Sequence, residues 1–243
     1  MIKTMLIAAV AALTVSTGAN AGGVSTNPPA DAGAENATND WSGRYVGVTA
    51  ANNSFDAETG ELSVDGTPFP APGFTFPNEG MSYGLEAGQI FQSKHLVYGF
   101  EVDASTASID GKFGSEEETL IISTHSNWMA SARGRLGFAT GNVLFYVTGG
   151  LAVANWDAQL TDYYTHNSEL IVFTPSVSET RTGWVDGIGA EFKVNQNWSV
   201  KAEYLRYDFG TETENFVEGD DRTFTSHGSY AGNQTRIGLN YRF

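Results

Sequence analysis

Apolar and polar residues alternate with a period of two at the end of the chain. Counting back from Phe243, every second residue is apolar or aromatic through Tyr241, Leu239 and Ile237, and the residues between them are polar or glycine. This period is typical of a β-strand whose two faces meet chemically different surroundings. We therefore predict that the chain ends in a two-faced strand.

The same alternation recurs in seven earlier segments. They are residues 43–51, 81–88, 98–105, 128–137, 143–154, 188–193 and 198–204. Helix signals are scarce, and glycine is frequent at 28 residues. With the terminal strand, the pattern predicts eight strands in one all-β domain.

Short and long connections between these strands strictly alternate. The short connections are residues 92–95, 139–142 and 195–197. The long connections are residues 52–79, 106–123, 155–180 and 210–229. All turns then lie at one end and all long loops at the other, as in barrels of bacterial outer membranes. The predicted fold is an eight-stranded antiparallel up-and-down transmembrane β-barrel.

The polar faces of the strands combine glycines with long charged side chains. An eight-stranded barrel is just wide enough for side chains to fill its interior, which suits this mixture. On the lipid side, Arg or Lys at mid-depth would cost ~2–4 kcal/mol each. We therefore predict a buried ion-pair network inside the barrel. Its members are Glu86, Glu101, Asp103, Arg133, Arg135, Glu191, Lys201, Glu203 and Arg236. The alternative is a water-soluble barrel with these charges outside.

Aromatic residues cluster near the strand ends, as expected for side chains at a membrane–water boundary. The turn-end set is Phe91, Phe138, Phe145, Phe192, Trp198 and Tyr241. The loop-end set is Trp128, Trp156, Trp184, Tyr207 and Tyr230. Two polar residues, Gln89 and Asp186, fall on the lipid face by strict alternation, which a bulge or a position at the membrane rim could explain.

The N-terminal residues are typical of an exported protein. Lys3 precedes an apolar run of about a dozen residues, and Ala19 and Ala21 form a small-residue cleavage site. We predict a signal peptide over residues 1–21 and cleavage after Ala21. Residues 22–40 are small, polar and Pro-containing, which predicts a flexible segment before a barrel domain over residues 41–243.

The formal charge of −15 argues against binding to nucleic acid, whose backbone attracts cationic proteins. The abundant acid suits a solvated surface, or one bridged to anionic lipid by divalent cations. The chain has no cysteine, so it has no disulfide or thiol chemistry.

Four segments resemble a known family. They are WSGRYVG from Trp41, FYVTGGLA from Phe145, NWSVKAEY from Asn197 and RIGLNYRF from Arg236. Together they are similar to the small outer-membrane β-barrels of alphaproteobacteria, called porin-family or opacity-like and related to the OmpA transmembrane domain. The resemblance implies that the last residues, Leu239, Tyr241 and Phe243, are read by the barrel-assembly machinery.

No catalytic or cofactor site emerges, and we expect neither an enzyme nor a bound cofactor. His125 and Ser126 are adjacent and would face opposite sides of a strand. Residues 116–118 and 220–221 are acidic and could hold Ca²⁺ or Mg²⁺ loosely, although a solvated loop tip is the simpler reading. Residues 163–166 contain two tyrosines and a histidine that could offer a ligand to haem iron.

These patterns indicate an integral outer-membrane protein with acidic surface-exposed loops and a structural role. Its expected partners are outer-membrane lipid and lipopolysaccharide, the assembly machinery, and host or phage surfaces. Two alternatives remain: a narrow porin for small solutes, and a surface receptor for haem or lipid. Eight strands leave little lumen, so the porin would have to conduct past the predicted ion pairs.

Overall fold

The computed structural model describes residues 40–59, 62–64, 67–69, 74–113, 120–166, 169–174, 176–218 and 222–243. The predicted signal peptide and almost all of the predicted flexible segment lie outside these residues, so both stay predictions. Within the described part of the chain, no helix is long and apolar enough to cross a membrane.

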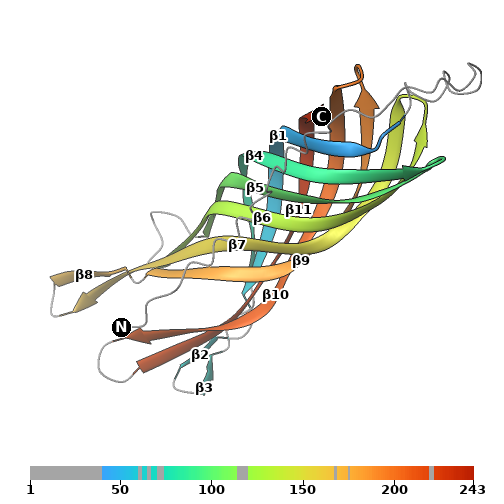
Figure 1. The fold of residues 1–243 in the computed structure, drawn as a ribbon. Coiled ribbons are helices and arrows are strands. Elements are labelled where there is room, and N and C mark those ends of the chain that lie inside the picture. Colours follow the sequence, from blue (N-terminus) through green and yellow to red (C-terminus); the bar gives the residue numbers. More distant parts are fainter. Residues whose placement is uncertain are drawn as a thin grey trace, which may run out of the picture. The chain divides into compact units, whose positions relative to one another are not determined.

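Eight long antiparallel strands form a closed barrel (Figure 1). They are β1 (Gly43–Thr59), β4 (Phe74–Ser93), β5 (Leu96–Phe113), β6 (Leu120–Thr140), β7 (Val143–His166), β9 (Ser176–Lys193), β10 (Trp198–Glu218) and β11 (Arg222–Arg242). Each strand pairs with the next, and β1 pairs with β11 to close the sheet. The eight-stranded barrel predicted from the alternation is confirmed.

The strand register sets the tilt of the barrel. Stepping from each residue to its paired residue on the next strand traces one full circuit of the barrel. The path runs through Val46, Ala87, Val102, Ala132, Leu151, Trp184, Asp208, Ala231 and Asp56. It returns to β1 ten residues further along the strand (56 minus 46). A stagger of this size tilts the strands by ~40° from the barrel axis.

Three short strands extend the sheet at the end opposite the short turns. Strands β2 (Leu62–Val64) and β3 (Thr67–Phe69) form a hairpin beside β11, and β8 (Glu169–Phe173) pairs with the end of β7. Figure 1 shows all three at one end of the barrel, with the C-terminus at the other.

The long connections predicted from the sequence are mostly strand. The interval 52–79, for example, contains the last part of β1, the β2–β3 hairpin and the first part of β4. The predicted boundaries of these connections are wrong because backbone pairing continues after the apolar alternation stops. Ladder hydrogen bonds satisfy the backbone whatever side chains it carries.

The short turns lie where the sequence predicts them. Lys94 and Gly141 have positive φ angles of 58° and 56°, which closes the first two turns tightly. The third turn spans residues 194–197, where the Asn195 side chain accepts hydrogen bonds from the backbone N–H groups of Asn197 and Trp198.

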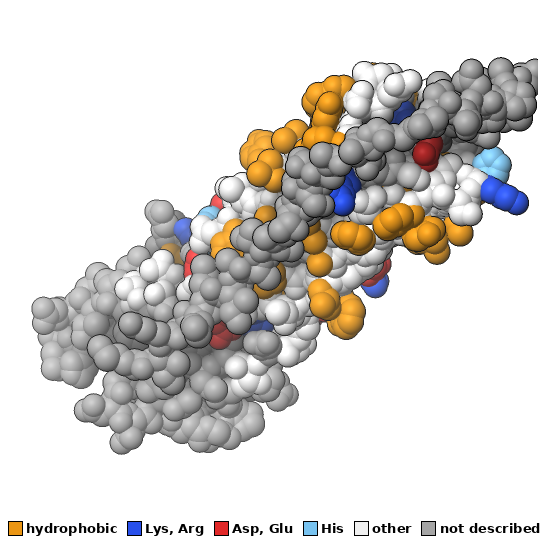
Figure 2. Space-filling view, in the orientation of Figure 1, with side chains coloured by type: hydrophobic (Ala, Val, Ile, Leu, Met, Phe, Trp, Pro, Cys, Tyr) orange, Lys and Arg blue, Asp and Glu red, His pale blue; other side chains and the backbone are white. Residues whose placement is uncertain are grey.

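Large apolar side chains point outward from all eight strands, and Figure 2 shows those on one side of the barrel. One from each strand in turn is Val48, Leu85, Phe100, Leu136, Val147, Ile188, Val200 and Ile237. Soluble monomers rarely expose contiguous apolar surface on this scale. The barrel therefore has its apolar face outside, and the alternative of a water-soluble barrel with charges outside is wrong.

The aromatic prediction holds at one end of the barrel and fails in part at the other. All six turn-end aromatic side chains are exposed on the outer face. At the loop end only Trp128 and Trp184 point outward, whereas Trp156, Tyr207 and Tyr230 are buried inside the barrel. These three residues occupy the inward parity of their strands, which the prediction from clustering alone overlooked.

Candidate functional site: the barrel interior

All nine charged residues of the predicted network point into the barrel and are buried. They lie on six strands, β4, β5, β6, β9, β10 and β11. The register brings opposite charges side by side. Glu101 pairs with Arg133, and Glu203 pairs with Arg236, at directly opposed positions of neighbouring strands.

Glu101 is the residue around which the network is arranged. Its Oε2 atom lies 2.7 Å from Nη2 of Arg135 and 3.0 Å from Nζ of Lys201. Its Oε1 atom accepts a hydrogen bond from Nη2 of Arg133. The hydroxyl of Tyr45 donates to Oε2 over 2.6 Å. The side chain of Glu101 is fully buried, so these groups replace its hydration shell.

Glu203 is held in a similar way from the other side of the interior. Its Oε2 atom lies 2.5 Å from Nη2 of Arg236 and 3.2 Å from Nζ of Lys201. The hydroxyl of Tyr146 donates to Oε1 over 2.9 Å. Arg236 also reaches Asp103, whose Oδ1 is 3.0 Å from its Nη1. Each cation therefore bridges two or more carboxylates.

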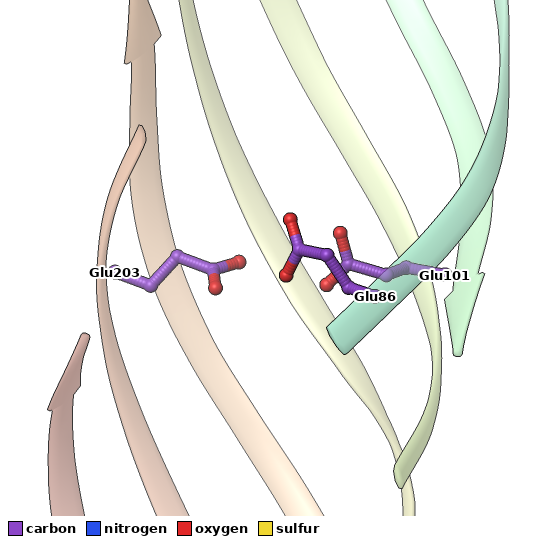
Figure 3. A group of neighbouring side chains, drawn as sticks. All are labelled: Glu86, Glu101 and Glu203. Atoms are coloured by element: carbon purple, nitrogen blue, oxygen red, sulfur yellow. The ribbon is translucent and has the colours of Figure 1, made fainter. Parts of the chain in front are cut away.

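Three of the carboxylates converge in a way that resembles a metal site. Glu86, Glu101 and Glu203 each place one oxygen within 4.8 Å of the others, from β4, β5 and β10 (Figure 3). Nζ of Lys201, however, lies 2.6 Å from Glu86, 3.0 Å from Glu101 and 3.2 Å from Glu203. The cation that these carboxylates surround is thus the ammonium group of Lys201, and a metal ion would have to displace it.

The charges of the central ion-pair network balance once one residue is added to the predicted set, although Arg181 and Lys193 are two further buried cations. Arg242 lies at the turn end of β11, with Nη2 3.6 Å from Oε1 of Glu191. Five carboxylates then face five cations. Arg242 and Tyr45 were not assigned to the network from the sequence, although both occupy the inward parity of their strands, and that parity is the signal that could have found them.

A polar layer and an aromatic layer lie beyond the charges toward the loop end. The amide of Gln234 donates to Asn53 over 2.8 Å and accepts from the hydroxyl of Tyr207 over 3.3 Å. Above it, Phe55 packs edge-on against Trp156 with ring centroids 5.7 Å apart, and Trp156 packs against Tyr230 at 4.8 Å.

A fourth layer closes the turn end. Trp41 is fully buried there, and its ring lies 4.7 Å from Nζ of Lys193 and 5.0 Å from the guanidinium carbon of Arg242. Its indole N–H donates to the carbonyl of Gly141. These cation–π contacts hold an aromatic side chain across the end of the barrel.

The histidines do not form a catalytic arrangement in the described part of the chain. His95 lies at a turn, where its ring stacks on Phe138. His125 points outward while Ser126 is buried on the other side of β6, as the sequence indicates. The side chains of residues 163–166 and of His227, and the acidic residues 116–118 and 220–221, lie outside the description, so the haem and Ca²⁺ readings stay untested.

The two residues that depart from the alternation both find polar partners. Gln89 accepts a hydrogen bond from Nε of Arg44 over 3.2 Å at the turn end. Asp186 points outward and pairs with Arg206. The terminal residues Leu239, Tyr241 and Phe243 also point outward, where another protein could read them.

The chain is similar to known bacterial proteins over nearly its whole length. A family described as outer membrane protein beta-barrel domain matches residues 5–243. The 31 kDa outer-membrane immunogenic protein of Brucella melitensis is 29% identical, over 99% of this chain and 100% of that protein. The 22 kDa outer membrane protein of Rhizobium leguminosarum is 26% identical, over 84% of this chain and 78% of that one.

A solved structure supports the same fold. The outer membrane protein OprG of Pseudomonas aeruginosa superposes with a TM-score of 0.57 at 14% identity, over 83% of this chain and 96% of that one. At this identity the likeness bears on the fold alone. The alphaproteobacterial resemblance noted in the sequence is confirmed by the Brucella and Rhizobium relatives.

Proposed function

The chain belongs to the outer membrane β-barrel family, and on that premise we propose that it is a surface-exposed structural protein whose barrel does not conduct solutes. Localisation in the outer membrane follows from the family. The structural role, as distinct from that of a pore, is the proposal.

The filled interior carries this proposal. The inward residues of β10 run from Lys201 and Glu203 through Leu205 to Tyr207 and Phe209, and all five are buried. They cross the charged layer and enter the aromatic layer, while Trp41 fills the turn end. A solute would need to break ion pairs in the middle and displace packed aromatic rings above them. An eight-stranded barrel is just wide enough for side chains to fill, so these packed residues leave little width for a path around them.

The acidic surface supports contacts outside the membrane. The strands continue past Trp128 and Trp184 toward the loop end, where Asp110 and Asp157 point outward. With a formal charge of −15, such a surface suits lipopolysaccharide bridged by divalent cations, or basic patches on host or phage proteins. We propose these as the partner classes, with the assembly machinery as the partner of the C-terminal strand.

We propose that the protein is not an enzyme. Among the hydrogen bonds of the described residues, none joins a Ser or Thr hydroxyl to a histidine, the arrangement that activates a hydroxyl nucleophile. The Brucella and Rhizobium relatives are named as outer membrane proteins without an enzymatic activity.

Planar-bilayer recording tests the structural role against the narrow porin. Refolded protein that shows a boiling-dependent shift on a gel is added to the bilayer, with a large bacterial porin as the control for insertion. We expect no unitary steps from the folded chain. Steady open steps whose conductance rises with salt would contradict the proposal and favour the porin.

A further inference from the structure

One ion pair interrupts the apolar outer face of the barrel. Arg206 on β10 donates from Nη2 and Nε to Oδ1 of Asp186 on β9, over 3.0 and 3.2 Å. Their side chains are 68% and 60% exposed. Charged side chains within a membrane-spanning segment are rare and normally face the protein interior or water, so an outward pair calls for a partner.

The pair lies at the loop-side edge of the apolar band, because the next outward residue of β10 beyond Arg206 is the exposed Asp208. The outward neighbours of Asp186 on the same strand are Trp184 and Ile188, which are 67% and 62% exposed. Tyr204, the outward neighbour of Arg206 on the turn side, is 50% exposed. Trp184 is the residue type typical of the membrane boundary, so Asp186 lies one outward position inside that boundary.

Small residues continue the row on one side of the pair. The register places Gly149 opposite Asp186, and Gly134 opposite Gly149, on the adjacent strands β7 and β6. Both glycines face outward, and a Cβ atom at either position would meet nothing closer than 3.6 Å. On the other side, Asn233 of β11 lies opposite Arg206 and also points outward. Because the row crosses five strands of a tilted, closed barrel, only its middle, the ion pair, faces a single neighbour in the membrane.

We propose that the Asp186–Arg206 pair is the centre of a contact between two copies of the chain in the membrane, where β9 and β10 of one copy meet β9 and β10 of the other. A two-fold axis along the membrane normal, passing between β9 and β10, puts Asp186 of each copy against Arg206 of the other. A two-fold contact requires such a self-complementary surface.

The charges favour a second copy over a lipid. A lipid phosphate would be attracted by Arg206 and repelled by the adjacent Asp186. A second copy offers each charge an additional opposite charge, and the four groups shield one another from the hydrocarbon.

Thiol crosslinking tests this contact directly because the chain has no cysteine. Ile188→Cys lies beside the proposed axis, and Leu85→Cys on β4 is an equally exposed control on the far side of the barrel. In outer-membrane vesicles treated with a short thiol–thiol crosslinker, we expect Ile188→Cys to give dimers and Leu85→Cys to give none. Equal yields from the two positions would overturn the proposal.

Charge reversal in the Ile188→Cys background tests the ion pairs themselves. Asp186→Arg alone and Arg206→Asp alone each place like charges across the axis, and we expect the dimer yield to fall about tenfold. Co-expressing the two variants with different tags restores opposite charges between copies, so mixed dimers should recover. Yields that do not respond to reversal, or mixed dimers that do not recover, would also overturn it.

Folding is checked for each variant by the boiling-dependent gel shift. If a reversal does not fold, Asp186→Asn and Arg206→Gln replace it, and each is expected to lower the dimer yield without recovery on mixing. Neutral variants that dimerise as well as the parent would contradict the ion-pair contact.

Discussion

Replacing Glu101 by glutamine should destabilise the barrel more than any comparable change on its surface. The substitution keeps the size of the side chain and its ability to accept from Tyr45, but it removes the negative charge. Three cations approach that carboxylate closely, with Arg135 at 2.7 Å and Lys201 at 3.0 Å, and Arg133 nearer still. The ion-pair network, balanced when Arg242 is counted, is then left with one more positive than negative charge.

The magnitude follows from the burial of that charge. At an effective dielectric constant of about 20, one ion pair at 4 Å contributes ~4 kcal/mol before desolvation is counted. Removing one partner of a buried pair costs about 3–5 kcal/mol in measured cases. With a urea dependence of about 1–3 kcal/mol per molar, the unfolding midpoint should fall by at least about 1 M.

The assay is urea unfolding of the refolded protein in detergent micelles, followed by the boiling-sensitive gel band and by tryptophan fluorescence. Glu79→Gln is the matched control, because Glu79 is an exposed glutamate on β4, and it should change stability by less than ~0.5 kcal/mol. The double variant Glu101→Gln/Lys201→Met restores the charge balance and should unfold at higher urea than Glu101→Gln alone. A Glu101→Gln midpoint equal to that of Glu79→Gln would refute the argument that paired charges hold the interior together.

Three further predictions concern other parts of the molecule. Trp41→Ala should lower the free energy of unfolding by about 3–5 kcal/mol, because it leaves a cavity where the buried indole ring packs at the turn end. An unchanged urea midpoint would contradict that packing role. Phe243→Ala should leave the stability of refolded protein nearly unchanged, because the ring is 75% exposed, but should reduce the amount of folded protein in outer-membrane fractions. Equal amounts would argue against its role as an assembly signal. Partial burial lowers the pKa of His125, but hydrogen bonds to Asp110 and Asn127 outweigh it and raise the pKa above 6.5. The folded protein should therefore be more stable than the His125→Gln variant at pH values below 6.5, and this difference in the free energy of unfolding should disappear as the pH rises through the raised pKa. NMR titration of the His125 imidazole measures that pKa directly.

The period-two alternation was sufficient to predict the barrel, its orientation and the inward position of nine charged residues. The reason is local. Successive side chains of a strand point to opposite faces, so residues two apart, such as Glu101 and Asp103, lie on the same face of the sheet. This holds whatever the strand packs against. The short turns were predictable for the same reason, since Gly141 and its neighbours interrupt the alternation where the chain reverses.

Tertiary structure decided what the alternation could not encode. Which carboxylate meets which cation depends on the register between strands, and register is set by pairing across the whole sheet. The sequence therefore contained Glu86, Glu101 and Glu203 without showing that all three converge on Lys201. Likewise, the alternation indicated that Asp186 departs from the apolar face, but only the pairing of β9 with β10 put Arg206 beside it. The inward direction of Trp156, Tyr207 and Tyr230 was already contained in the parity of their strands, but only barrel closure brings their rings together in one packed layer, because they come from three different strands.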